Sequence, residues 1–374
     1  MNLKSSKLFS EDRLLSLDFF RGITMFLLVA ESTHLWSVLV QPPIEGTIVE
    51  SFFRQFHHHP WNGLRFWDLI QPFFMFIVGV AMPFSYAKRK KRGDSEATIT
   101  RHIIKRCIIL LAFGVALHCV YNRKLVWELW NVLSQLSVTI LIAYFLMRYK
   151  WSTQIVVSLA ILLLSEILYR TFPLEGYNQP FVKDHNFGSW VDMLLMGKIN
   201  NGGGWVAINC LPTAAHTIWG VVAGQLLQST KIAPKKVQLL SVAGLTILFA
   251  GYILDWTSVT PIIKRIATSS FVLASGGWAL LALAFSYWLI DIKKINQWIF
   301  PFVVVGTNSI FIYLFSNTVG AQWLNEFVSI FTTGFFAWFK TPEFLINLIT
   351  ALSVLSLEWL LCYYLFTKRI LFRV

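Results

Sequence analysis

The first long apolar segment of this sequence carries side chains that could do chemistry inside a membrane. Asp18 and Arg21 stand three positions apart, and Glu31 and His34 repeat that spacing further along the segment. Residues three apart lie on one face of a helix, so we expect a polar stripe with a pair near each end. Charged groups at membrane depth are costly and usually pair or line a site. The stripe therefore predicts either helix-end ion pairs or part of a binding site.

A run of histidines forms the second candidate site. It reads His57-His58-His59-Pro60-Trp61-Asn62-Gly63, and Asp68 follows at the outer end of the next apolar segment. Histidine titrates near neutral pH, so it can take a proton from an attacking amine or hydroxyl, and a nearby carboxylate can fix its tautomer. Three adjacent histidines cannot all point into one site, and a solvated loop with adventitious metal affinity is the alternative. The spacing lacks the separated ligands of a zinc site, so no metal is expected.

Composition predicts the class of protein that must hold these residues. The chain has 374 residues, of which 56% are apolar and 14% charged, and its mean hydropathy is +0.59. A soluble domain carries roughly 25% charged residues. The net charge of +13 would suggest a nucleic-acid partner only in a soluble protein, so none is expected here. Walker A, GxGxxG and GxSxG motifs are absent, and the four cysteines lack CxxC spacing. We predict an all-α, multi-pass bundle in membrane lipid.

Apolar segments of about 20 residues predict the spans. We expect about ten transmembrane helices in a single domain, 1–374, with 320–338 as a re-entrant or interfacial helix or an eleventh span. The Thr-Thr-Gly sequence at 332–334 favours an interruption there. The predicted spans are 15–37, 65–87, 102–120, 129–148, 152–170, 206–228, 236–255, 267–290, 297–317 and 343–367.

The distribution of basic residues predicts the orientation. Most of the 32 lysines and arginines fall on one side when the N-terminus is placed in the cytoplasm, including Lys4, Lys7, Arg13 and Arg373. Both termini are then cytoplasmic, as are the short N-terminus 1–14 and the basic loop 88–101. The long loops 38–64 and 171–205, the second ending in 200–204, are then periplasmic. No small-residue cleavage site follows the first segment, so a cleaved signal peptide is rejected. We expect a multi-pass membrane protein.

Isolated polar residues inside other apolar segments are weaker candidates. His118, Glu166, His216 and Glu358 each stand alone, and we interpret them as interior residues with satisfied hydrogen bonds. The basic run 88–92 is typical of a topology determinant beside anionic lipid. With Arg101 and Arg106 it could also form an electropositive entrance for a phosphorylated cofactor.

Several motifs, in the same order over nearly the whole chain, resemble the heparan-α-glucosaminide N-acetyltransferase family and its bacterial relatives, some of them described as N-acetylglucosamine-related transporters. They are Arg13-Leu-Leu-Ser-Leu-Asp18-Phe-Phe-Arg21-Gly22, His58-His-Pro-Trp61-Asn62-Gly63, Asp68-Leu-Ile-Gln-Pro72, Lys105-Arg106 with Gly114, Val132-Leu133, Trp190-Val-Asp192, Gly220-Val-Val-Ala-Gly224 and Gly306-Thr-Asn308-Ser309.

The resemblance implies a homodimeric enzyme of a bacterial inner membrane that moves an acetyl group from cytosolic acetyl-CoA to an amino sugar on the other side of the membrane. It also implies that the histidine three residues before the Trp61 equivalent is catalytic, which is His58 here. Two positions depart from the family pattern. Ser32 stands where enzyme members often have asparagine, and Ser134-Gln135 replaces an element that commonly contains arginine. Glu31, beside Ser32, could orient His58 or deprotonate an ammonium group.

We assign roles on this basis. The catalytic residues are His58, Glu31 and Asn308, the last as an amide donor to an acyl oxyanion. The residues expected at the acceptor are Asp18, His34, Trp61, Asn62, Asp68 and Asp192. Those expected to hold acetyl-CoA are Arg21, Arg101, Lys105, Arg106 and Ser309. The alternatives are a permease for N-acetylglucosamine-like sugars and an O-acetyltransferase acting on cell-wall glycans.

Overall fold

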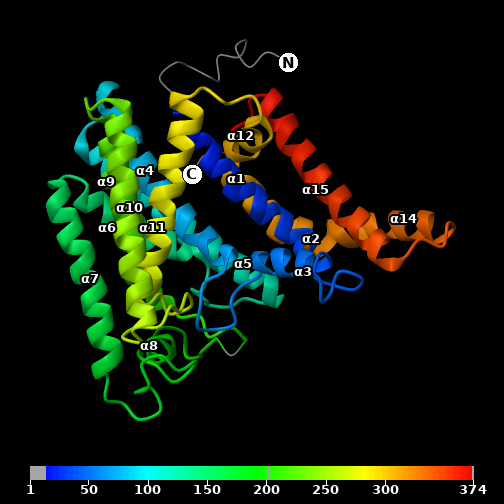
Figure 1. Cartoon of the computed structure of the whole chain (residues 1–374), viewed down its shortest axis with the longest axis horizontal. Coiled ribbons are helices and arrows are strands. Elements are labelled where there is room, and N and C mark those ends of the chain that lie inside the picture. The colour runs from blue at the N-terminus through cyan, green and yellow to red at the C-terminus, as the bar shows by residue number, and fades with distance from the viewer. Residues whose placement is uncertain (1–13, 201, 373–374) are drawn as a thin grey trace. The chain divides into compact units, whose positions relative to one another are not determined.

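The computed structural model describes residues 14–200 and 202–372 (Figure 1). Helices and loops make up this part of the chain, with no strand among the described residues. The all-α prediction is therefore confirmed for the described residues. The predicted cytoplasmic N-terminus falls almost wholly on residues outside the description, as do the basic residues Lys4, Lys7, Arg13 and Arg373.

The chain divides into two compact units. The first joins the two ends of the chain, Met1–His58 and Phe285–Val374, and the second is His59–Ala284. The unit boundary therefore passes through the histidine run.

The second unit is built around α9 (Cys210–Gln228), which packs against α4 (Ile70–Lys91), α6 (Val132–Leu146) and α7 (Trp151–Thr171). Glycine lets two of these backbones approach closely, because a Cβ at Gly220 would collide with the carbonyl oxygen of Phe76. The unit also contains α5 (Glu96–Asn122), α10 (Ala233–Trp256) and all but the last two residues of α11 (Ser269–Ser286). Side-chain caps start several of its helices, as where Asn131 Oδ1 accepts a hydrogen bond from Leu133 N at 2.8 Å.

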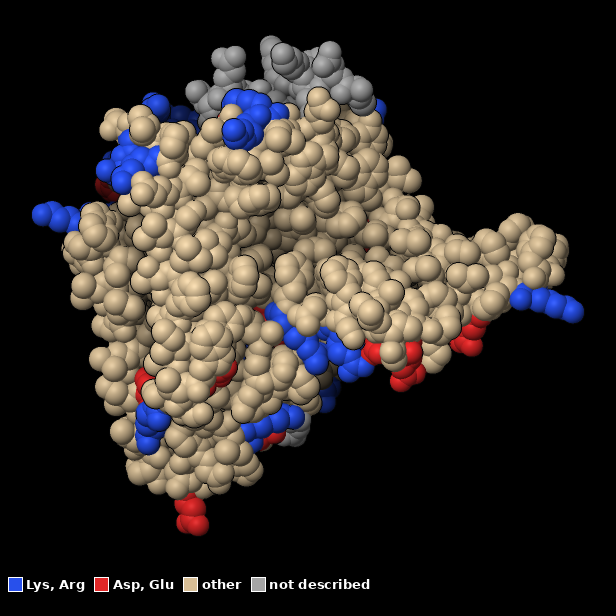
Figure 2. Space-filling view, viewed as in Figure 1, with Lys and Arg blue, Asp and Glu red and all other residues tan. Residues whose placement is uncertain are grey.

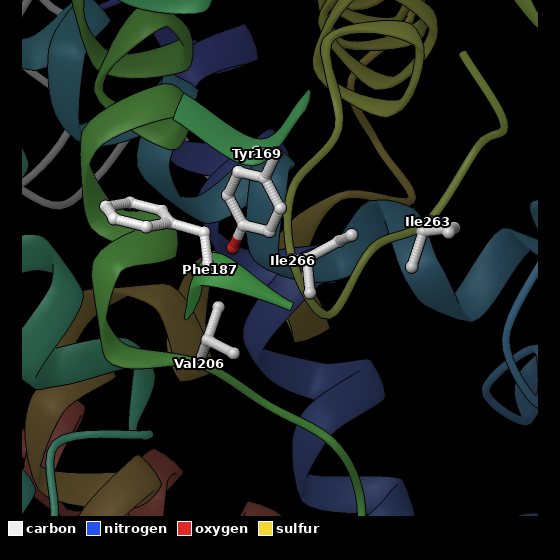
Figure 3. Packing of buried hydrophobic residues seen from close by; sticks show 5 residues of the cluster. All are labelled: Tyr169, Phe187, Val206, Ile263 and Ile266. Atoms are coloured by element: carbon white, nitrogen blue, oxygen red, sulfur yellow. The ribbon is translucent and has the colours of Figure 1, made fainter. Parts of the chain in front are cut away.

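Short helices lie in the loops of this unit and carry candidate site residues. They are η3 (Phe66–Leu69), α8 (Phe187–Met196) and η4 (Ala207–Asn209). Figure 3 shows the buried cluster of Tyr169, Phe187, Val206, Ile263 and Ile266, which comes from the end of α7, from α8 and from two loops. Trp61 packs against this cluster. The cluster therefore ties the loop after the histidine run to distant parts of the same unit.

The first unit is organised around α1 (Leu15–Ser32) and α12 (Phe300–Thr307), which are in extensive contact. Asp291, in the π-helix η5 (Tyr287–Ile292), accepts hydrogen bonds from Leu15 N and Ser16 N, each at 3.1 Å. A carboxylate at a helix N-terminus satisfies unpaired N–H groups and suits the helix dipole. Further elements are α2 (Leu35–Val38), α3 (Ile48–Phe53), η2 (Arg54–Phe56), α13 (Ser309–Phe315), the π-helix η6 (Ser316–Leu324), α14 (Asn325–Ala337) and α15 (Glu343–Thr367).

Six helices of the described chain are long and apolar enough to cross a membrane. They are Phe66–Lys91, Glu96–Asn122, Trp151–Thr171, Ala233–Trp256, Ser269–Ile292 and Glu343–Thr367. A bent pair, Phe300–Thr307 with Ser309–Ala337, adds a seventh if it counts as one span. Helices also occupy the other predicted segments, but α6 has only 15 residues and the 18 residues of α1 include Asp18, Arg21 and Glu31. The prediction of about ten spans is not confirmed.

Two predicted boundaries move. The basic run 88–92 lies in the last turn and cap of α4 rather than in a long loop, because Lys and Arg suit a helix C-terminus. The Thr-Thr-Gly sequence at 332–334 does not interrupt α14, and the break lies instead at Asn308, where the chain bends by 81°. Figure 2 shows wide uncharged surface between small groups of charged side chains, as expected of a protein with many apolar helices.

Candidate active site

The three histidines of the run have different surroundings. His57 Nε2 lies 3.1 Å from the carbonyl oxygen of Trp36, whose ring stacks on Phe56. The side chain of His58 is exposed, and that of His59 is half-buried. The prediction that the three cannot serve one site together agrees with this arrangement.

Asp68 organises the loop that follows His58. Its side chain is buried at the start of α4's span, and Oδ2 accepts hydrogen bonds from the backbone N–H of His59 at 3.2 Å and of Arg65 at 3.0 Å. Its Oδ1 lies 3.7 Å from Nζ of Lys264, which is also buried. The carboxylate therefore joins the backbone of His59 to that of Arg65 and holds residues 59–65 as a closed loop. The structure gives Asp68 a loop-holding role, and its predicted contact with an acceptor is untested.

Gly63 and Trp61 fix the far side of this loop. Gly63 N donates to the carbonyl oxygen of Ile262 at 2.8 Å, and Trp61 Nε1 donates to that of Phe181 at 2.8 Å. Gly63 has a φ of 134°, and a Cβ there would lie 2.7 Å from Nε2 of His59. Only glycine fits that backbone conformation and that space. Asn62, between the two, is exposed.

The surroundings of His59 influence its ionisation. Burial lowers the pKa of His59, the Arg65 guanidinium lowers it further, and the Asp68 carboxylate opposes both. The imidazole is therefore biased towards its neutral form at neutral pH.

Asp192 joins three segments of the second unit. It is fully buried in α8, its Oδ1 accepts a hydrogen bond from Ala207 N at 2.8 Å, and its Oδ2 accepts one from Trp130 Nε1 at 2.7 Å. Burial raises the pKa of Asp192 to about 7, although both hydrogen bonds lower it. Both oxygens are engaged inside the protein, so the structure shows Asp192 as a structural link, and its predicted contact with an acceptor is untested.

A chain of side-chain amides runs through the second unit. Gln71 of α4 donates to Gln135 of α6, which donates to Asn209 Oδ1 at 2.6 Å, and Asn209 Nδ2 donates to the carbonyl oxygen of Arg265 at 3.1 Å. Gln71 stands three residues after Asp68, and Arg265 directly follows Lys264, which faces Asp68. Asp68 and Lys264 both support the histidine loop. The amide chain therefore connects the segments that carry these two residues through the helical bundle.

Two groups of charged side chains in this unit were not predicted from the sequence. Glu128 is buried, and its oxygens lie 2.8 Å from His118 Nδ1 and 2.5 Å from Lys198 Nζ. Lys264 Nζ lies 5.4 Å from the centre of the Trp205 ring, and Arg265 Cζ lies 5.9 Å from it. The available signal was the position of each group, since Glu128 directly precedes one predicted span and Lys264-Arg265 falls in a short loop between two others.

The isolated polar residues differ in their partners. Glu166 accepts hydrogen bonds from Arg170 and Thr260, and His216 Nε2 lies 2.9 Å from Ser275 Oγ. His118 is paired with Glu128. The interpretation as interior residues with satisfied hydrogen bonds is confirmed for Glu166, but Nε2 of His118 and Nδ1 of His216 have no hydrogen-bond partner among the described residues. It is wrong for Glu358, whose two oxygens have no hydrogen-bond partner among the described residues.

The predicted pair at the start of the first unit forms. Arg21 donates to Asp18 Oδ1 at 2.9 Å, and its Nε donates to the carbonyl oxygen of Gly306 in α12 at 3.0 Å. Both side chains therefore help to hold α1 against α12. The roles assigned to Asp18 at the acceptor and to Arg21 at acetyl-CoA are untested.

The predicted helical pairing of Glu31 with His34 is wrong. α1 ends at Ser32, and His34 adopts a left-handed conformation with a φ of 63°. Asn325 Nδ2 donates to the carbonyl oxygen of Ser32 at 2.8 Å and so satisfies the end of the helix. Both Glu31 and His34 are exposed, but helical spacing does not place them on one face.

Asn308 uses both ends of its amide inside the first unit. Nδ2 donates to the carbonyl oxygen of Ile370 at 2.9 Å, and Oδ1 accepts from Phe372 N at 3.0 Å. Ser309 Oγ donates to the carbonyl oxygen of Gly306 at 2.7 Å. The buried amide therefore pins the residues after α15 to the bend between α12 and α13. The structure shows this anchoring role, and the predicted role of Asn308 as an amide donor to an acyl oxyanion is untested.

Apart from Arg21 in α1, the basic residues expected to hold acetyl-CoA lie on α5, after the α4–α5 connection. Arg101 and Lys105 are exposed on α5, whereas Arg106 is half-buried. Within the run 88–92, Arg89 pairs with Asp94 at 3.0 Å and Lys90 pairs with Glu96 at 2.6 Å. Part of the basic charge therefore ties α4 to α5, while Lys88, Lys91 and Arg92 are exposed.

Comparison with known proteins gives one family. The model of the family described as heparan-alpha-glucosaminide N-acetyltransferase, catalytic, matches residues 13–255. The heparan-alpha-glucosaminide N-acetyltransferase of Mus musculus is 28% identical over 149 residues, which are 38% of this chain and 20% of that protein. The Homo sapiens protein of the same name is 30% identical over 103 residues, 28% of this chain and 13% of that protein. The matched stretches thus span a fifth or less of these relatives. The family match covers more than half of the chain and contains the histidine loop, Asp68 and Asp192, so this chain belongs to the family of heparan-alpha-glucosaminide N-acetyltransferase catalytic domains.

Proposed function

We propose that this protein is a membrane acetyltransferase that moves the acetyl group of acetyl-CoA to the amino group of an amino sugar, with His58 as the general base. Membership of the family supports the reaction class, and the apolar helices support a place in a membrane. The acceptor lies on the periplasmic side of a bacterial inner membrane in this proposal, and the enzyme acts as a homodimer.

The observation that carries the assignment of His58 is the fixed loop on which it stands. His57 is bonded to the Trp36 carbonyl, and the His59 ring packs on Gly63. Asp68 holds the backbone directly after His58 through the His59 N–H. The exposed imidazole of His58 is therefore presented on backbone fixed from both sides, as a catalytic base needs.

The chemistry follows from the imidazole. The acceptor amine attacks the thioester carbonyl, the C–N bond forms, and His58 takes the proton that the amine loses. The C–S bond then breaks, and the thiolate of CoA receives that proton, so the products are an N-acetyl amino sugar and CoA. Arg101, Lys105 and the exposed members of the run 88–92 would bind the CoA phosphates by charge-assisted hydrogen bonds. In this proposal Asn308 has a structural role.

The histidine run offers matched controls for the test. Purified protein in lipid vesicles is incubated with acetyl-labelled CoA and glucosamine, and the labelled sugar is measured. His58→Gln should lose at least about 100-fold in turnover, the usual contribution of a general base. His59→Gln should retain most activity, and His57→Gln should lose activity only in step with its thermal stability. Equal activity of His58→Gln and the unmodified protein would overturn the assignment of the base.

Two further outcomes test the reaction itself. Sugar uptake into vesicles without CoA consumption would show that the protein is a permease and not an acetyltransferase. Label that appears on muropeptide fragments but never on glucosamine would show that the acceptor group is a hydroxyl and not an amine.

A further inference from the structure

Glu358 is a buried carboxyl group for which the described residues supply no hydrogen-bond or ion-pair partner. It lies near the middle of α15, a helix long and apolar enough to span a membrane, and it is 1% exposed. Neither Oε1 nor Oε2 has a hydrogen-bond partner in the described part of the chain. An isolated buried carboxylate is so costly that such a group binds a proton or a cation instead.

Glu358 is surrounded by apolar residues of α15 and by the π-helical stretch η6. Val354, Leu355 and Cys362, one turn before and after Glu358, are buried on the same face. Oε1 lies against Gly320 of η6, where a Cβ would collide with it. η6 is a π-helical stretch of nine residues, Ser316–Leu324, and π-helical turns in α-helices often mark functional sites.

Other titratable groups on the elements packed against α15 do not satisfy this carboxyl. Those elements are α1, α2, α12, α14 and η6. α2, α12 and η6 contain no ionisable side chain. On α1, Asp18 and Arg21 pair with each other and Glu31 is exposed, and on α14 Glu326 is exposed. The nearest titratable group along α15 is the thiol of Cys362, which is buried.

We propose that Glu358 and the π-helical turn at Gly320 form an intramembrane proton-binding site, in which the bound proton holds η6 against α15. With the proton bound, the neutral carboxylic acid can stay in the apolar contact. When the O–H bond breaks, the proton passes to water and the carboxylate that remains requires hydration. Ionisation therefore opens the contact between η6 and α15. This site is independent of the acetyl-transfer proposal, since it needs no acyl donor.

Infrared spectroscopy of the full chain in lipid vesicles tests the protonation state. The difference between the unmodified protein and Glu358→Gln at neutral pH should contain the C=O stretch of a carboxylic acid, shifted in D2O. The matched control, Glu326→Gln, should remove only ionised-carboxylate bands because Glu326 is exposed. A Glu358→Gln difference made of ionised-carboxylate bands would overturn the proposal. An acid band present in choline buffer but absent in sodium buffer would also overturn it, by assigning the site to a metal cation.

Cys362 provides a native reporter of the opening. Its alkylation by a maleimide can be followed by mass spectrometry of its peptide. In the unmodified protein the rate should rise severalfold more at alkaline pH than in Glu358→Gln, which has the same thiol but cannot ionise at position 358. Gly320→Ala should displace the carboxyl and speed labelling already at neutral pH. Identical pH profiles of the unmodified protein and Glu358→Gln would contradict a proton-controlled contact.

Discussion

The carboxylate of Asp68 accepts a hydrogen bond from the backbone N–H of His59, the residue directly after the proposed base. The same oxygen accepts from Arg65 N, and the other oxygen faces the buried ammonium of Lys264. One side chain therefore links the loop start, the loop end and a segment almost two hundred residues further along the chain.

Replacing Asp68 by alanine should destabilise the protein and abolish acetyl transfer. The change removes two hydrogen bonds, each of about 1 kcal/mol, and leaves Lys264 buried without its counter-charge, so we expect a loss of roughly 3–5 kcal/mol. Thermal unfolding in detergent and the transfer assay check both effects. Asp68→Asn keeps one acceptor oxygen, so its stability and its activity should lie between those of the unmodified protein and those of Asp68→Ala. As a control, Glu175→Gln changes an exposed acid and should leave both measurements unaltered.

Gly63→Ala should disturb the His59 ring rather than the backbone alone. The added Cβ meets the imidazole at under 3 Å, and the φ of 134° is unfavourable for alanine. We expect a lower melting temperature and at least about tenfold slower turnover, equivalent to about 1.4 kcal/mol. Gly46→Ala is the matched control, because Gly46 also has a positive φ but has nothing within 4 Å of a new Cβ. If the two variants behave alike, contact with His59 is unimportant.

Helical spacing predicted the pairing of Asp18 with Arg21 because both residues lie inside one regular helix. The same spacing failed for Glu31 and His34, since α1 ends at Ser32, whose carbonyl is satisfied by Asn325 from the other end of the chain. No glycine or proline marks that helix end in the sequence. A helix end set by a partner almost three hundred residues away cannot be found from local sequence.

The candidate site also combines contacts that local sequence could predict with contacts that it could not. The nearness of Asp68 to the histidine run was predictable, because only a short loop separates them. The contacts of Asp192 with Trp130 and of Gln135 with Asn209 join residues over 60 positions apart, and they depend on how the helices pack. Hydropathy also predicted where the helices lie, but it could not give their lengths or the bend at Asn308, which a buried amide stabilises.

Asn308→Ala should release the chain after α15. It removes the hydrogen bonds to Ile370 and Phe372, so we expect a loss of roughly 2 kcal/mol and faster removal of the C-terminal residues by carboxypeptidase. Asn308→Asp, which retains an acceptor for Phe372 N, should be less affected. A variant with normal stability and normal protease resistance but much lower turnover would instead assign Asn308 to the chemistry.

The protein should lose stability as the pH rises towards 7 because of Asp192. The pKa of this carboxyl is 3.8 in its ordinary state and about 7 in the folded protein, so the folded state retains a proton that the unfolded state releases. The unfolding free energy should therefore fall between about pH 4 and pH 7, by up to roughly 4 kcal/mol. Melting temperatures measured across this range should show a shallower slope for Asp192→Asn. An unchanged slope would mean that Asp192 is already ionised in the folded protein.

Gln135→Leu should slow acetyl transfer from within the helical bundle. The change breaks the amide chain between Gln71 and Asn209, leaves their buried polar groups without these partners, and loosens both supports of the Asp68 loop. Unsatisfied buried groups cost about 1–3 kcal/mol each, so thermal stability should fall as well. Gln135→Glu, which retains an acceptor for Gln71, should restore part of the stability. If the chain positions the loop, turnover should fall while the KM for acetyl-CoA changes little. A Gln135→Leu protein that loses stability but turns over normally would show that the amide chain only supports the fold.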